Sequence, residues 1–205
     1  PGNVNPQDGL DEPAHDVFQI CGTVQCGSFH VERAVAEGGF AVVYRALHGA
    51  FRAPVALKCL KVPGRMSDAD RAAFLEKFRV EAELMFRLSA SFPAGVRPLH
   101  VDHFVAPTGA FVPFLALEWL EGEPLANVID RRAMQGKPPV TLRRAMDLLT
   151  PVARALHRAH HFPGKDGPVA VVHCDIKPDN LFLTEIEGKP AIKILDFGVA
   201  KARSL

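Results

Sequence analysis

The sequence predicts an α+β fold, and three observations carry that prediction. From Phe29 onward, two β-branched runs flank the paired glycines Gly38-Gly39, as in a β-hairpin. Two longer stretches, 67–88 and 141–160, repeat apolar residues with the 3.6-residue period of a helix. Between them, residues 111–119 form a nearly continuous apolar run, which is typical of a strand buried on both faces.

The composition indicates a globular chain with balanced charge. Hydrophobic residues make up 48% of the 205 residues, and 24 Lys and Arg stand against 23 Asp and Glu. This balance argues against a nucleic-acid partner bound through bulk charge. No apolar run reaches the length of a membrane span, since Phe111–Leu120 already contains Pro113 and Glu118.

The N-terminal residues resemble a linker. Residues 1–16 contain three prolines, two glycines and four acidic residues, with no Lys or Arg. We therefore expect 1–28 to be a linker or flexible arm. The chain shows no signal peptide and no initiator Met, so we expect it to be cut from a longer protein with further domains. Its four cysteines are expected to be reduced thiols of a cytoplasmic protein.

The first long helix is predicted from its start signal and its period. Ser67–Asp70 resembles a capping box that opens a helix. Apolar residues then recur on one face at Phe74, Phe78, Met85 and Leu88. At about 100° per residue, Glu81 falls inside this apolar stripe, while Glu76 and Glu83 point to the opposite side. A carboxylate on a buried face needs a partner, and the other two acids are expected to face solvent.

A second helix is predicted to open at Thr141. Its apolar stripe is expected to consist of Leu142, Met146, Leu149, Ala153, Leu156 and His160. Pro151 lies inside this helix and can kink it. Val169–Val172 then leads into the stretch with the densest chemistry.

That stretch is His173-Cys174-Asp175-Ile176-Lys177-Pro178-Asp179-Asn180. It places a carboxylate that can accept a proton, an ammonium that can neutralise a phosphate and an amide that can bind a hard cation within six residues. Pro178 fixes φ and removes a donor, which favours a shaped loop over a helix. A second carboxylate, in Asp196-Phe197-Gly198, follows the apolar run 192–195, where a shared metal ion would need it.

These two motifs, in this order, resemble the catalytic loop and metal-binding turn of the eukaryotic-like (Hanks-type) serine/threonine protein kinases. The resemblance runs from about Phe29 to Leu205. It covers about two-thirds of a family domain, up to a few residues after Asp-Phe-Gly, and lacks the activation segment and the later helices. It implies a bilobal fold. Residues 29–117 would form an antiparallel N-lobe sheet with one long helix, and 118–205 the hinge and a partial, mainly helical C-lobe.

The resemblance also implies the site residues and their ligands, ATP and Mg²⁺, with a Ser/Thr-containing protein as substrate. The implied catalytic residues are Asp175, Lys177 and Asn180, and the implied metal ligands are Asn180 and Asp196. The implied nucleotide-binding residues are Ala36, Gly38, Gly39, Val43, Ala56, Lys58, Glu81, Leu117, Glu118, Leu120 and Phe182. By this resemblance, Lys58 would pair with Glu81 of the first long helix and would contact the α- and β-phosphates. Of the family's three loop glycines only Gly38 is present, because Ala36 and Ala41 replace the others.

Two other functions stay open at this point. A small-molecule kinase of the aminoglycoside-phosphotransferase type shares the His-x-Asp and Asn pattern, but typically lacks a lysine like Lys177. A nucleotide-binding or docking scaffold without activity would fit the two lost glycines. Against the scaffold, every charged residue that the phosphoryl-transfer chemistry requires is present.

Overall fold

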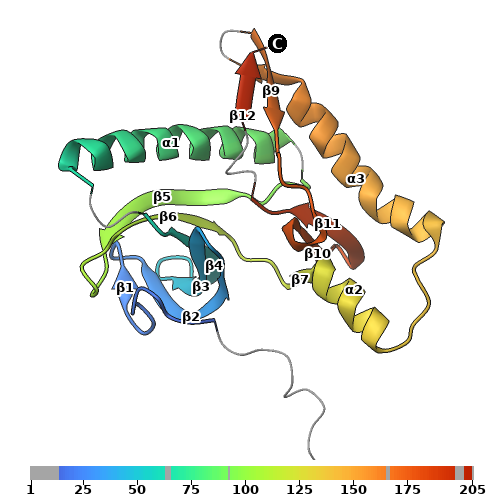
Figure 1. Ribbon diagram of the computed structural model, residues 1–205, viewed down its shortest axis with the longest axis horizontal. Coiled ribbons are helices and arrows are strands. Elements are labelled where there is room, and N and C mark those ends of the chain that lie inside the picture. Colours follow the sequence, from blue (N-terminus) through green and yellow to red (C-terminus); the bar gives the residue numbers. More distant parts are fainter. Residues whose placement is uncertain (1–13, 63–65, 92, 165–166, 197–200, 205) are drawn as a thin grey trace, which may run out of the picture. The chain divides into compact units, whose positions relative to one another are not determined.

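The computed structural model describes residues 14–62, 66–91, 93–164, 167–196 and 201–204 (Figure 1). The chain divides into two compact units. Unit 1 contains Pro1–Lys77 and Leu99–Trp119, and unit 2 contains Phe78–Pro98 and Leu120–Leu205. The mixture of an antiparallel sheet with long helices confirms the predicted α+β class.

Unit 1 is built on a six-stranded sheet with the order β1-β2-β3-β4-β6-β5. Its strands are β1 (Val24–Gln25), β2 (Phe29–Glu37), β3 (Ala41–His48), β4 (Ala53–Leu60), β5 (Pro98–Val105) and β6 (Phe111–Glu118). The predicted hairpin is confirmed, because β2 and β3 pair antiparallel up to Glu37 and Val42, on either side of the glycines. The predicted double-sided burial of β6 is also confirmed, since residues 112–116 are all buried.

One face of this sheet forms the core of unit 1. Alternate residues of β3, β4 and β6 are each 0–2% exposed: Val42, Tyr44, Ala46, Val55, Leu57, Cys59, Val112, Phe114 and Ala116. They line up across the strands, as Tyr44 opposite Leu57 and Leu57 opposite Ala116 illustrate. Because side chains alternate along a strand, the opposite face carries the residues between them.

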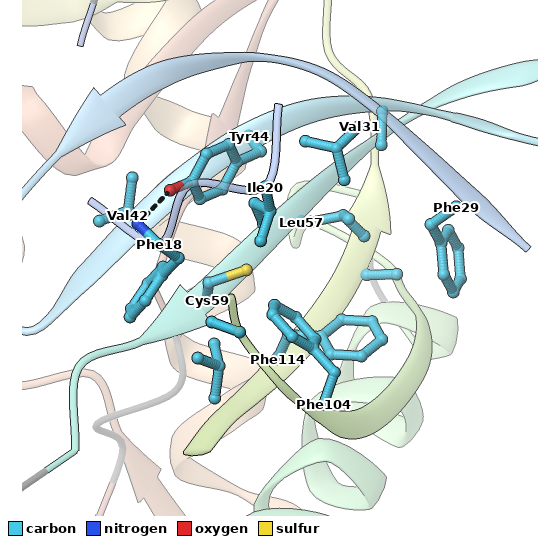
Figure 2. Close-up of a cluster of buried hydrophobic side chains, with 14 of the residues drawn as sticks. Phe18, Ile20, Phe29, Val31, Val42, Tyr44, Leu57, Cys59, Phe104 and Phe114 are labelled. Atoms are coloured by element: carbon cyan, nitrogen blue, oxygen red, sulfur yellow. Dashed lines mark hydrogen bonds between the residues drawn. The ribbon is translucent and has the colours of Figure 1, made fainter. Parts of the chain in front are cut away.

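The segment before β2 contributes to the same core. Phe18 and Ile20 are 5% and 0% exposed, and Figure 2 shows them packed among Tyr44, Leu57 and Cys59. The stretch from Ala14, which its composition placed in a linker or arm, is therefore packed against the sheet, while residues 1–13 lie outside the described part. Composition missed this because two well-placed apolar side chains are enough to bury such a segment.

The helix α1 (Asp68–Ser91) begins where the sequence predicted. Ser67 Oγ accepts from the Asp70 N–H at 3.1 Å, and Asp70 Oδ2 accepts from the Ser67 N–H at 3.3 Å, which is the reciprocal bonding of a capping box. Ala82, Met85 and Leu88 are the buried residues of its second half. The expectation that Glu81 lies on the buried face was wrong, because Ala82 takes that position and Glu81 is exposed.

Besides the second half of α1, the described part of unit 2 combines two further α-helices with two small sheets. Its elements are β7 (Gly122–Pro124), α2 (Leu125–Met134), α3 (Leu142–His160), β8 (Phe162–Gly164), β9 (Gly167–Val172), the 3₁₀ turn η1 (Pro178–Asn180), β10 (Leu181–Ile186), β11 (Lys189–Ile194) and β12 (Lys201–Ser204). The sheets have the orders β11-β10-β7 and β12-β9-β8, and α3 packs against β9 and β11. Among the residues described, no helix is both long and apolar enough to span a bilayer.

The helix α3 starts as predicted but packs through a different face. Thr141 is its N-cap and accepts from the Arg144 N–H at 3.4 Å. The predicted stripe is exposed in its first half, with Leu142 at 77% and Met146 at 58%. The buried residues are instead Val152, Ala155 and Ala159, because small side chains let the helix approach β9 and β11 closely.

Candidate active site

In the loop between β9 and β10, the Asp175 carboxylate is held by two side chains. The Asn180 amide nitrogen Nδ2 donates to the Asp175 carbonyl and to its carboxylate oxygen Oδ2, both at 2.8 Å. Asn180 is only 8% exposed, so its own position is fixed by packing. The Asp175 carboxylate is therefore presented to solvent from a rigid support, as a group that meets an incoming substrate needs to be.

Lys177 contacts the same carboxylate oxygen and keeps it charged. Its ammonium Nζ lies 3.1 Å from Asp175 Oδ2. The hydrogen bond from Lys177, followed by that from Asn180, holds the pKa of Asp175 below its usual range despite some opposing desolvation. Asp175 is consequently ionised at neutral pH and can accept a proton.

His173 connects this loop to the strand end that precedes Asp196. The ring is 1% exposed, its Nε2 lies 2.8 Å from the Leu195 carbonyl, and its Nδ1 lies 3.3 Å from the Asp175 backbone N–H. A carbonyl only accepts and a backbone N–H only donates, so these two contacts match the tautomer in which Nε2 donates and Nδ1 accepts. His173 thus bridges the backbones on both sides of the site.

A second bridge brings Asp196 next to Asn180. The Leu195 N–H donates to the Asn180 carbonyl at 2.8 Å, directly after the β10–β11 pair ends at Leu181 and Ile194. Leu195 is therefore bonded on its N–H to Asn180 and on its carbonyl to His173, and the residue that follows it is Asp196. The backbones of the predicted metal ligands Asn180 and Asp196 therefore lie close together, while Phe197 and Gly198 lie outside the described residues.

The donor atoms of this pair fit a hard divalent cation. Both partners of Asn180 Nδ2 are acceptors, which fixes the orientation of the amide and makes Oδ1 the side-chain atom through which Asn180 can bind a metal. An amide oxygen and a carboxylate are ligands that Mg²⁺ accepts. Within the described ranges, no cluster of three or more His, Cys, Asp or Glu is placed to bind a metal, so a cation here would also need water or phosphate oxygens.

Two non-glycine residues of this region have left-handed backbone conformations. Cys174 has φ 66° and Asp196 has φ 59°, each adjacent to a residue of the His173–Leu195 bridge. Such conformations cost free energy and persist where the surrounding structure enforces them, which is common at functional sites. They turn the chain just before Asp175 and just after Leu195.

Five of the predicted nucleotide-binding residues of unit 1 share one face of its sheet: Ala36, Val43, Ala56, Lys58 and Leu117. Ala36 is opposite Val43, and Val43 is opposite Lys58. Ala56 lies two residues before Lys58 on β4 and is opposite Leu117 on β6, so it shares that face. This face is opposite the core. The side chains of these five residues are half-buried or exposed, whereas Leu115, opposite Lys58 on the same face, is buried. The sheet thus presents an apolar strip beside one ammonium, which suits a flat base attached to a phosphate chain.

The remaining predicted residues are placed as follows. Gly38 and Gly39 form the β2–β3 turn, Glu118 ends β6, and Leu120 lies between β6 and β7. Phe182 is half-buried on β10, opposite Lys193 of β11. Lys58 and Glu118 belong to unit 1, whereas Glu81, Leu120 and the Asp175 loop belong to unit 2. The Lys58–Glu81 pair and the convergence of both sets on one nucleotide therefore stay predictions.

Sequence reasoning missed several residues that position the site. His173 was part of the quoted motif but was given no role, although its place two residues before Asp175 was a usable signal. The contribution of Leu195 is made by its backbone, so no side-chain pattern could reveal it. Lys61, which contacts the glycine turn, follows the Lys58 strand without any local motif.

Comparisons with known proteins agree with this geometry. The family model described as the protein kinase domain matches residues 29–204. The chain is 35% identical over 182 residues to the tyrosine-protein kinase MasK of Myxococcus xanthus, covering 87% of this chain and 26% of that protein. It is 32% identical over 182 residues to the serine/threonine-protein kinase PknA of Mycobacterium tuberculosis, covering 88% of this chain and 37% of PknA. A third relative, the serine/threonine-protein kinase Pkn1 of Myxococcus xanthus, is 30% identical over 179 residues, covering 87% of this chain and 22% of Pkn1.

The chain thus spans between about a quarter and two-fifths of the length of these curated relatives. The family match nevertheless extends over most of its residues and includes both the strand with Lys58 and the loop with Asp175. Asn180 and Lys177 hold Asp175, and Leu195, the residue before Asp196, is bonded to Asn180. Together with the family match, we conclude that this chain belongs to the protein kinase family.

Proposed function

We propose that this chain carries the machinery that transfers the γ-phosphoryl group of ATP to a Ser or Thr hydroxyl of a protein. The observation that carries the proposal is the Asp175 carboxylate, ionised and exposed, with Asn180 and Lys177 bonded to one of its oxygens. A proton acceptor fixed in this way suits a hydroxyl nucleophile.

In the proposed reaction, Asp175 orients the substrate hydroxyl and accepts its proton. The hydroxyl oxygen forms a bond to the γ-phosphorus while the bond to the β–γ bridging oxygen breaks, and ADP leaves with that electron pair. Lys177, which is 50% exposed and lies at the carboxylate, can exchange its contact with Asp175 for one with a γ-phosphate oxygen. Little covalent chemistry falls to the protein, so position and charge account for most of the rate.

The nucleotide would bind to the sheet face of unit 1. Val43, Ala56 and Leu117 would contact the adenine, and the Glu118 carbonyl and Leu120 N–H would be its hydrogen-bond partners. Lys58, braced by Glu81, would contact the α- and β-phosphates under the turn of Gly38 and Gly39. The half-buried apolar strip next to Lys58 supports this assignment.

A bound Mg²⁺ would neutralise phosphate charge, and Asn180 and Asp196 are the residues that would hold it. The preference for Ser or Thr over Tyr rests on Lys177, two residues after the catalytic carboxylate, by family resemblance. The relatives' names divide on this point, since MasK is named a tyrosine kinase and PknA and Pkn1 are named serine/threonine kinases.

The proposal is tested by Asp175→Asn in the full chain, assayed with MgATP on a panel of Ser-, Thr- and Tyr-containing peptides. The variant keeps the shape of the side chain but loses the proton acceptor, so we expect kcat to fall about 10²-fold or more while ATP affinity changes little. Asp179→Asn is the matched control, because Asp179 is an exposed carboxylate of the same loop.

Equal activity of Asp175→Asn and the wild-type protein would rule out the role of the carboxylate. Transfer to Tyr peptides alone would contradict the Ser/Thr assignment, and transfer to small amino sugars alone would favour an aminoglycoside-type enzyme. A wild-type chain that binds ATP without phosphorylating any acceptor would be a nucleotide-binding scaffold.

A further inference from the structure

One lysine outside the predicted site makes three contacts with the glycine turn of unit 1. Lys61 follows the end of β4, and its ammonium Nζ lies 2.7 Å from Glu37 Oε1 and 3.0 Å from the Gly38 carbonyl. Its backbone N–H donates to the Phe40 carbonyl at 2.8 Å. We infer that Lys61 is a positioning residue that holds this turn in its nucleotide-covering conformation, an inference that rests on the proposed function.

The turn has little packing of its own. Phe40 is 88% exposed, and a Cβ added at Gly39 would meet no atom within 4 Å. A Cβ at Gly38 would meet only the Ala41 carbonyl, at 3.8 Å. Side-chain burial therefore contributes little to its order, and the hydrogen bonds decide its position.

The contacts of Lys61 are distributed over the whole turn. They reach Glu37 at the end of β2, Gly38 inside the turn and Phe40 just before β3. A cross-turn bond from the Gly38 N–H to the Ala41 carbonyl, at 2.8 Å, closes the hairpin itself. That bond fixes the shape of the turn, whereas the Lys61 contacts fix its place relative to β4.

The place of the turn relative to β4 matters because β4 also carries Lys58. Lys61 follows Lys58 by three positions, a span of about 10 Å in extended chain. One strand thus sets the position of the ammonium predicted to contact the phosphates and of the backbone predicted to cover them. A turn already held in place loses less conformational entropy when the nucleotide binds, so affinity rises without a new contact to the ligand.

The two alanines in this loop make such a support more useful. With Ala36 and Ala41 where the family has glycine, the hairpin keeps Gly38 and Gly39 as its flexible positions. A glycine pair adopts many conformations, and the ammonium bonded to Gly38 selects one of them. The Lys61 and Glu37 side chains are 27% and 37% exposed, respectively. Because water screens such a pair, we expect loss of the Lys61 ammonium to weaken ATP binding moderately and not to abolish it.

The test compares four variants in the full chain: Lys61→Met, Lys61→Arg, Glu37→Gln and Glu32→Gln. Lys61→Met removes the ammonium and keeps the backbone N–H, and we expect KM for ATP to rise about 3- to 10-fold with kcat within about 2-fold of wild type. Lys61→Arg can remake both contacts and should restore a KM near that of the wild type. Glu37→Gln should give an intermediate rise.

Glu32→Gln is the matched control. Glu32 lies five residues before Glu37 on the same strand, and its ion pair with Arg45 is similarly exposed, at 39% and 30% for the two side chains. It breaks an equivalent pair away from the turn and should leave KM unchanged. Hydrogen exchange at the Gly38 amide provides a second readout, which should be faster in Lys61→Met and not in Glu32→Gln.

If the wild-type protein is active, two results would overturn the positioning role of Lys61. One is a Lys61→Met variant with the wild-type KM for ATP, and the other is a Glu32→Gln variant whose KM rises as much as that of Lys61→Met. Gly38 exchange that does not change in Lys61→Met would overturn it as well. A wild-type chain that binds no ATP would instead overturn the proposed function, and the exchange measurement separates the two failures because it needs no nucleotide.

Discussion

At the scale of single residues, the Asp175 carboxylate owes its charge state to its neighbours. Lys177 and Asn180 both contact Oδ2, one with a charge and one with a neutral amide. The amide is buried and fixes the position of the carboxylate, whereas the ammonium is half-exposed and contributes most to lowering its pKa. Position and ionisation are therefore controlled by different side chains.

This division predicts the effect of Lys177→Met on pH dependence. Removing the hydrogen bond from Lys177 raises the pKa of Asp175 toward its usual range. A base acts in its deprotonated form, so the acid limb of the kcat/KM profile should move to higher pH in the variant. The profile is measured with one peptide for the wild type and for Lys177→Met, with folding followed in parallel.

Lys189→Met serves as its control, because Lys189 is an exposed lysine in the β10–β11 hairpin. Lys189→Met should change neither kcat/KM nor the pH at which its acid limb lies. An acid limb that stays in place in Lys177→Met, or moves to lower pH, would contradict the assignment of this limb to Asp175.

At the scale of elements, the short strand β7 depends on one glycine. Gly122 has φ +139°, and a Cβ at this position would lie 2.0 Å from the Leu183 carbonyl oxygen of β10. Gly122 also pairs with Thr184, whose hydroxyl donates to the Glu121 carbonyl at 2.7 Å. The strand that follows the predicted hinge can therefore join β10 only with glycine at this position.

Gly122→Ala should lower the free energy of unfolding by about 3 kcal/mol or more, since a backbone clash adds to an unfavourable φ. Gly109→Ala is the control, because Gly109 also has positive φ, at +79°, but its Cβ would meet no atom within 4 Å. That variant should lose only about 1 kcal/mol. Equal losses in denaturant unfolding would show that the β7–β10 approach is not as close as described.

The same pairing places an ion pair beside the loop that contains Asp175. Both terminal nitrogens of the Arg131 guanidinium contact the Glu123 carboxylate, and α2 and β7 both pack against η1. Any ligand group that approached the Glu123 carboxylate would have to compete with this bidentate pair.

At the scale of the whole molecule, the residues before β2 are joined to the sheet of unit 1 by a polar link as well as by Phe18 and Ile20. Asp16 Oδ1 accepts from the Ile20 N–H at 3.1 Å and from the Tyr44 hydroxyl at 3.0 Å, and its Oδ2 accepts from the Cys21 N–H at 2.9 Å. Tyr44 is fully buried and its hydroxyl accepts from the Phe18 N–H at 3.3 Å (Figure 2). Tyr44 thereby connects the segment to the centre of the core.

This link predicts a pH-dependent contribution to stability. Burial by itself raises the pKa of Asp16, but the hydrogen bonds from Cys21, Ile20 and Tyr44 outweigh it, and the net pKa lies below its ordinary 3.8. A pKa depressed by folding stabilises the protein fully above the unfolded value, and this stabilisation disappears as pH falls through the folded value.

Asp16→Asn should therefore lower the free energy of unfolding by about 1–3 kcal/mol at neutral pH, because its amide cannot replace all three accepted bonds. The difference from the wild type should shrink below about pH 4. Unfolding followed from neutral to acidic pH measures it, with Asp130→Asn, at an exposed carboxylate of α2, as the control. A difference that grows on acidification would refute the sign of the effect.

Much of this arrangement could be predicted because local chemistry enforces it. The glycine pair favours a turn, the side chains of Ser67 and Asp70 each accept from the other's backbone N–H to cap a helix, and Pro178 keeps the Asp175 loop out of an α-helix. The alternation in β3 and β4 likewise separates Val43 and Lys58 from the core residues. These features involve residues close together in sequence, so a pattern is enough to find them.

The choice of packed face was less predictable. Apolar periodicity predicted one buried stripe for each long helix, yet α1 buries Ala82 where Glu81 was expected, and α3 packs through Val152 and Ala155 while Leu142 stays exposed. Apolar periodicity shows which face could be buried. Which face is buried depends on the strands that reach it, and these come from distant parts of the chain.

The sequence alone determined the family, the α+β class and the residues that carry charge and metal-binding capacity, because these follow from residue types at short spacings. Tertiary structure alone decided what holds them: the His173 and Leu195 bridges, the Lys61 contacts on the glycine turn, and the place of Asp16 beside Tyr44. Each joins backbone or side-chain atoms of residues that no short motif contains, since folding, and not sequence distance, makes them neighbours.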